Sequence, residues 1–93
     1  MHEVLLNQSA SKPIVTFHAN TLEYFSLTSQ TGGFSYYIGH IKSIEIITDK
    51  KGRYTLVTKT DTRTIETDVS EQALAKAKEL VAAVQEAIKT VKL

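Results

Sequence analysis

The fold is decided by residues 41–69, which read IKSIEIITDKKGRYTLVTKTDTRTIETDV. Three runs rich in β-branched residues favour strands, and they are Ile41–Thr48, Tyr54–Thr60 and Arg63–Val69. Residues 49–52 (DKKG) predict a type I turn closed by a left-handed glycine, a common hairpin connection. Residues 60–62 predict a second tight turn. Six threonines lie between Arg53 and Asp68, which is typical of the solvated face of an antiparallel sheet.

A long amphipathic helix is predicted from Ser70 to about Lys92. Its apolar residues recur at spacings of 3 and 4, the period of one helix face, and they are Leu74, Ala77, Val81, Val84, Ile88 and Val91, widened by Ala73, Leu80 and Ala87. Asp68 or Ser70 can cap the helix, and Asp68 with Glu71 resembles a capping box. A helix of this length spans roughly 30 Å, so we expect it to lie along the sheets or to close a barrel.

The first half of the chain predicts further strands. Three segments are rich in β-branched and aromatic residues, namely residues 14–18, 22–27 and 34–38. Residues 19–21 predict a tight turn because asparagine tolerates left-handed geometry, and residues 28–33 predict a loop. Gly39-His40 interrupts the β pattern, which indicates a bulge or a bend between sheets.

These segments predict a single domain over residues 1–93. Residues 1–12 form either an N-terminal arm or a first strand, and the pattern leaves both readings open. Residues 14–69 supply antiparallel strands, and residues 70–92 supply the helix.

Composition and charge narrow the function classes. The chain has 93 residues, 42% hydrophobic and 23% charged, with a formal net charge of +1, as in an ordinary soluble globular domain. Because the charges are interleaved, no nucleic-acid partner is expected. The chain has no cysteine, which excludes thiol catalysis and zinc-thiolate sites and favours a cytoplasmic setting. Its N-terminal apolar run, residues 4–6, is too short for a signal peptide or a membrane span.

Residues 37–46 read YIGHIKSIEI and resemble the I-P-L-x-x-I-x-S-I/V-E-I stretch that is common in bacterial pleckstrin-homology-like (PH-like) domains. Up to seven β runs followed by one C-terminal helix is also the order of elements in that fold. The resemblance is best over residues 36–92, and the chain departs from the pattern at Gly39-His40, where Pro-Leu is usual.

The resemblance implies a fold that is mainly β (α+β). Two roughly orthogonal antiparallel sheets, of six or seven strands in total, would form a barrel closed by the C-terminal helix. It also implies a non-catalytic binding module, because members of that fold bind phosphoinositide head groups, peptides or proteins. Phosphoinositide-binding members carry a basic cluster in the first hairpin loop. That loop holds only Lys12 if it is residues 7–12, and no basic residue if it is residues 19–21, so inositol-phosphate binding is not expected.

No catalytic, cofactor-binding or metal-binding residues are predicted. His2, His18 and His40 are the only side chains that titrate near neutral pH. No His-x-x-x-His or carboxylate–histidine spacing connects them, whereas a metal site or a hydrolytic triad requires such groups to converge. A small enzyme remains the least favoured alternative.

Two groups of residues are candidates for binding. Tyr36 and Tyr37 are adjacent, so one of them should face solvent, and with His40 at the predicted bend they form a possible interface. This interface suits a protein partner or a homo-oligomer formed by edge-strand pairing. Lys50, Lys51 and Arg53 are the densest basic cluster. They indicate, as the alternative, weak peripheral binding of the 49–53 hairpin to an anionic membrane or to phosphate ligands.

Overall fold

The computed structural model describes residues 1–26 and 33–92. Over these residues the strands and helices are, in chain order, β1 (His2–Leu5), β2 (Pro13–His18), β3 (Thr21–Ser26), β4 (Phe34–Tyr37), the 3₁₀ turn η1 (Ile38–His40), β5 (Ile41–Thr48), β6 (Tyr54–Thr60), β7 (Thr64–Val69), the 3₁₀ turn η2 (Glu71–Ala73) and α1 (Leu74–Lys92). The open question about residues 1–12 is settled, because His2–Leu5 form a first strand. The loop predicted over residues 28–33 lies, except for Gly33, outside the described residues.

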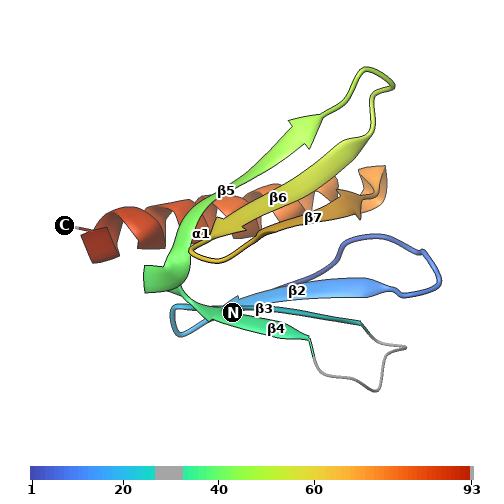
Figure 1. Cartoon of the computed structure of the whole chain (residues 1–93). Helices are drawn as coiled ribbons and strands as arrows, with labels where there is room; N and C mark the ends of the chain where they lie inside the picture. The colour runs from blue at the N-terminus through green and yellow to red at the C-terminus, as the bar shows by residue number, and fades with distance from the viewer. Residues whose placement is uncertain (27–32, 93) are drawn as a thin grey trace.

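The strands form two antiparallel sheets. The four-stranded sheet has the order β1-β2-β3-β4, and the three-stranded sheet has the order β5-β6-β7. In Figure 1 the four-stranded sheet lies below the three-stranded sheet, and α1 runs alongside the latter. The helix contacts β5, η1 and β1, and so touches both sheets. The prediction of a mainly β fold with two antiparallel sheets and one C-terminal helix is therefore confirmed.

Two hairpin turns adopt the geometry that their residues favour. Ala19 and Asn20 have φ of 51° and 60°, as in a type I′ turn, whose twist matches that of the flanking strands. Gly52 has φ of 78°, and its N–H donates to the Asp49 carbonyl at 3.1 Å. The predicted left-handed glycine at this turn is confirmed.

The bend between the sheets lies at the predicted position. The 3₁₀ turn Ile38–His40 connects β4 to β5, and the register of β5 on β6 shifts between Ile41 and Ser43. Ile38 and Ile41 are buried on either side of this corner. The shift explains why Ile41 and Ile44, three residues apart, both point into the core although strand side chains alternate.

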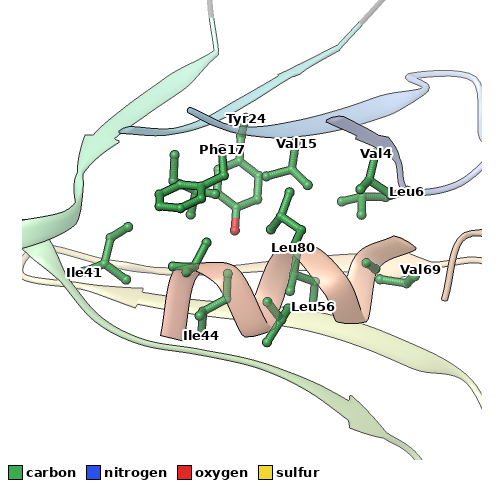
Figure 2. Packing of buried hydrophobic residues seen from close by; sticks show 14 of the residues in the cluster. Val4, Leu6, Val15, Phe17, Tyr24, Ile41, Ile44, Leu56, Val69 and Leu80 are labelled. Atoms are coloured by element: carbon green, nitrogen blue, oxygen red, sulfur yellow. The ribbon is translucent and has the colours of Figure 1, made fainter. Parts of the chain in front are cut away.

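The core lies between the inner faces of the two sheets and one face of α1. Its buried residues come from most of the strands and from the helix, and they include Val4, Leu6, Val15, Phe17, Leu22, Ile44, Leu56, Val69, Ala77, Leu80 and Val84. Figure 2 shows Leu80 of the helix between side chains of the four-stranded sheet and Leu56 of β6. Each fully buried aliphatic side chain contributes roughly 1.5–3 kcal/mol, so this shared core holds the layers together.

The ends of the helix differ from the prediction. Ser70 is the cap, because its Oγ accepts a hydrogen bond from the Ala73 N–H at 3.3 Å. The Asp68 capping box is wrong, since Asp68 is still part of β7. The first turn is 3₁₀, so the α-helix begins at Leu74 rather than at Ser70. Val91 does not extend the buried stripe, because it is 43% exposed beyond the edge of the core.

The prediction that the threonines form a solvated face is wrong for two threonines of β6. Thr58 and Thr60 are buried, because they share the inward face of β6 with Leu56. The hydroxyl groups of Thr58 and Tyr24 form a hydrogen bond across the core. Thr60 donates a hydrogen bond from Oγ1 to the Arg63 carbonyl at 3.1 Å. Both buried hydroxyls are therefore satisfied, as buried polar groups usually are.

Proline 13 helps to join the two sheets. The Leu6 N–H donates to the Pro13 carbonyl at 2.9 Å, but proline has no N–H to return the bond. The Leu6 carbonyl instead accepts the Ser70 N–H at 2.7 Å, and Asn7 Nδ2 donates to the Asp68 carbonyl at 2.6 Å. These bonds connect the end of β1 to the end of β7.

Tyr24 should make stability depend on alkaline pH. Burial raises the pKa of Tyr24 from 10.0 to about 12. A group whose folded pKa is raised stabilises the fold fully below pH 10 and loses that contribution as the pH rises toward 12. We expect the wild type to lose roughly 2–3 kcal/mol from this group over that interval.

The Tyr24→Phe variant should be less stable than wild type at pH 7 by roughly 1 kcal/mol or more, since it leaves the Thr58 hydroxyl unpaired. Its stability should then fall less between pH 10 and 12. Denaturant unfolding at several pH values measures both effects. Tyr37→Phe, at an exposed position, is the control and should follow the wild type. Equal pH slopes for Tyr24→Phe and wild type would contradict the assignment.

Candidate functional site

The three-stranded sheet has two outer strands, β5 and β7. Along an antiparallel pair, the N–H and C=O of successive residues point alternately toward the partner strand and away from it. The Asp49 N–H donates to the Arg53 carbonyl at 2.9 Å, which fixes this alternation on β5. Residues 44, 46 and 48 therefore direct their peptide groups away from β6. Gln85 on α1 confirms this, because its Nε2 donates to the outward Ile44 carbonyl at 2.8 Å.

The second half of β5 is an open strand edge. The peptide groups of Ile46 and Thr48 point outward, and no hydrogen bond within residues 1–26 and 33–92 uses them. Ile47, on the outer face between them, is 43% exposed. Proteins usually protect such an edge with a proline, a bulge or a covering loop. In β5 only the first half is covered, by the Gln85 amide.

The edge of β7 is also partly open. The Thr60 N–H donates to the Arg63 carbonyl at 2.8 Å, so residues 64, 66 and 68 point away from β6. Asn7 uses the Asp68 carbonyl, while the outward peptide groups of Thr64 and Glu66 have no partner among the described residues. Beside this edge an open cleft of about 600 Å³ separates residues 66–68 from residues 7–13.

The predicted interface residues lie on β4 and η1. Tyr36 is half-buried against the core and Tyr37 is 53% exposed, as their alternation predicts. His40 lies in η1 with its ring exposed. The three residues are therefore close in the chain, but the fold directs Tyr36 into the core.

Three contacts of the β6–β7 turn could not be found from sequence spacing. Asp61, in the β6–β7 turn, accepts from or pairs with His40, with Nδ1 and Oδ2 3.1 Å apart. The Asp61 N–H also donates to the His40 carbonyl at 3.1 Å. Arg63 lies over the ring of the exposed Phe34 at 4.4 Å from its centroid. The two Asp61 contacts join the β6–β7 turn to the β4–β5 corner, and the Arg63 contact joins it to the start of β4. Only the fold brings these segments together.

The basic hairpin is organised by Asp49. Its carboxylate accepts hydrogen bonds from the Lys51 and Arg53 N–H groups at 2.8 and 2.9 Å and from Arg53 Nε at 2.8 Å. The backbone hydrogen bond from Arg53 is the main reason why the pKa of Asp49 lies below its usual value of 3.8. Arg53 is thus occupied within the turn, whereas the exposed Lys50 and Lys51 form no ion pair with a described residue.

The histidines do not form a metal site within the part of the chain that the structure describes, where no group of three or more histidine, cysteine and acidic side chains converges. Sequence spacing did not indicate a carboxylate beside any histidine, but the β6–β7 turn carries Asp61 to His40. The two side chains are 67% and 51% exposed, so water competes for both partners. Within residues 1–26 and 33–92, no helix has both the length and the hydropathy needed to cross a membrane.

Comparisons with protein-family models, with curated proteins and with solved structures found no match for this chain. The candidate site therefore stands on its own geometry. Its strongest element is the pair of open edges on the three-stranded sheet, because unpaired peptide groups specify the kind of ligand that satisfies them.

The hydrogen bonds to the Asp49 carboxylate should persist at acidic pH. Because the pKa of Asp49 is lowered in the folded state, the stability it contributes is present above pH 3.8 and is lost as the pH falls through the lower folded value. In an NMR titration, the shifts of the amide protons of Lys51 and Arg53 should therefore have their midpoint below pH 3.8. Asp49→Asn, which keeps one acceptor oxygen, should remove this titration. Amide shifts with a midpoint above 3.8 would contradict the arrangement.

Proposed function

We propose that this chain is a non-catalytic interaction module that binds a further β-strand, supplied by a second copy or by a partner protein. The observation that carries the proposal is the open edge of β5, where the outward peptide groups of Ile46 and Thr48 have no partner among the described residues. An added strand satisfies these groups, and each hydrogen bond so formed contributes roughly 0.5–1.5 kcal/mol. The exposed Ile47 supplies apolar area next to them.

We further propose that the module is PH-like. The order of four strands, three strands and a C-terminal helix supports this, as does the bend at Ile38–His40 within the stretch that resembles bacterial PH-like domains. The bonds from Ser70 and Asn7 that join the sheets are consistent with a barrel-like arrangement. Catalysis is not proposed, because the His40–Asp61 pair lies on the open surface where water reaches both groups.

Blocking the β5 edge should abolish strand binding. Thr48→Pro removes an outward N–H that the β5–β6 ladder does not use, and proline is tolerated at such edge positions. We expect light scattering to show that the wild type self-associates, or pull-down experiments to show that it captures a defined partner, and that Thr48→Pro does neither. Ile47→Lys should weaken the same association.

Thr55→Lys is the matched control, because Thr55 lies beside Ile47 on the same face but on the central strand. It should leave association unchanged. A wild type that stays monomeric over a wide concentration range and captures no partner would contradict the proposed function. So would association that Thr48→Pro leaves intact.

A second candidate function is peripheral binding to an anionic surface, and the Asp49 bonds favour it. They fix the hairpin turn and leave Lys50 and Lys51 exposed at its tip without an internal ion pair among the described residues. A basic side chain near an anionic membrane contributes about 1 kcal/mol. Two such residues give weak, salt-sensitive attraction, which is why this function ranks second.

Sedimentation with vesicles tests this alternative. Binding to phosphatidylserine-containing vesicles should exceed binding to phosphatidylcholine vesicles and should decrease with salt. The double variant Lys50→Glu/Lys51→Glu should reduce it by at least about tenfold. Lys76→Glu/Lys78→Glu on the exposed side of α1 makes the same charge change and should have a smaller effect. Equal binding to both vesicle types would remove this function.

A further inference from the structure

We propose that the added strand comes from a second copy of this chain, and that β5 of one copy pairs in parallel with β7 of the next. The inference rests on the proposed function and names its partner. It follows from the two open edges of the three-stranded sheet, which lie on opposite sides of the same layer. Each copy therefore has one open edge on β5 and another on β7, and the β5 edge of one copy can pair with the β7 edge of the next.

The direction of the pair follows from the topology. β5 and β7 are each antiparallel to β6, so they run in the same direction. When β5 of one copy meets β7 of the next and the outer faces of both sheets stay on one side, the two strands must be parallel. The joined sheets then continue one another, with the helices of both copies on the same side.

The open peptide groups define a register. In a parallel pair, a residue that points toward the partner strand bonds to the two residues flanking its opposite number. Ile46 opposite Ile65 bonds to Thr64 and Glu66 of the next copy. Thr48 opposite Thr67 bonds to the Glu66 carbonyl and the Asp68 N–H, so the Asp68 carbonyl stays with Asn7.

The side chains on both faces of the sheet are compatible with this register. Ile46 and Ile65 both pack against the core of their own copy, so the inner faces match. Ile47 comes to lie beside the aliphatic part of Glu66 on the outer face. The exposed surface of Ile47 is thereby covered, which is a gain of the hydrophobic kind.

Charges at one end of the pair are complementary. The register brings the Lys50–Lys51 turn to the end of β7, where Asp68 and Glu71 lie. Neither lysine and neither of these two acids forms an ion pair with a described residue of its own copy. Asp49, which also approaches Asp68, is already neutralised by Arg53. Opposite charges therefore favour this register.

Such an assembly does not stop at a dimer. The contact is heterologous, because β5 of one copy uses β7 of another, and each added copy presents a new open edge. Rings or filaments result, depending on whether the rotation between copies closes. Wild-type mass by light scattering should therefore rise with concentration beyond twice 10.3 kDa.

Charge reversal provides the test. Lys50→Glu/Lys51→Glu and Asp68→Lys/Glu71→Lys should each weaken association at least tenfold, since each places like charges together. An equimolar mixture of the two variants should associate again, and so should one chain that carries all four substitutions. Lys76→Glu/Lys78→Glu changes the net charge as the first variant does and should have no effect.

Cysteine cross-linking tests the register, because the natural chain has no cysteine. Under mild oxidation, Ile47→Cys chains mixed with Glu66→Cys chains should give a mixed disulfide dimer. Ile47→Cys mixed with Ala82→Cys, at an exposed position on α1, should not.

The outcomes separate this inference from the proposed function. Association that Thr48→Pro abolishes but charge reversal leaves unchanged would overturn the β5–β7 pairing and leave the strand-binding function standing. Restored association in the mixture without the 47–66 cross-link would overturn the parallel register. A wild type that is monomeric at every concentration would overturn the second copy as partner, and capture of a different protein at β5 would then preserve the function alone.

Discussion

The structure depends on one constraint: two small sheets must bury their inner faces, and the apolar side of α1 packs against both. The helix contacts β5 of one sheet and β1 of the other, and Leu80 and Val84 are fully buried between them. A chain of this size has material for one core. The parts of the backbone that this core does not cover are consequently strand edges, turns and the bend between the sheets.

The same constraint explains why the open peptide groups lie where they do. The helix reaches the first half of β5, where Gln85 covers the Ile44 carbonyl, but the β5–β6 hairpin continues beyond it in Figure 1. At the other side of the sheet, Asn7 covers only the Asp68 end of β7. Binding potential in this molecule therefore arises where the packing of the core ends. It does not depend on a cluster of reactive side chains.

The buried polar side chains of the core have hydrogen-bond partners. The Tyr24 and Thr58 hydroxyls satisfy each other between the sheets, and no buried side-chain nitrogen or oxygen among the described residues lacks a partner. Pro13 contributes through a missing donor. Because proline has no N–H to bond to the Leu6 carbonyl, that carbonyl accepts the Ser70 N–H instead. Both features join segments that are distant in the chain.

The strands of residues 41–69, the Gly52 turn, the bend at Gly39-His40 and the helix could all be predicted from the amino-acid sequence. These depend on local periodicity and on the φ preferences of single residues. The burial of Thr58, the contact between Asp61 and His40 and the open peptide groups on β5 and β7 became visible only in the folded chain. Those outcomes depend on which segments meet after the core forms, and local spacing carries no information about contacts between distant parts of the chain.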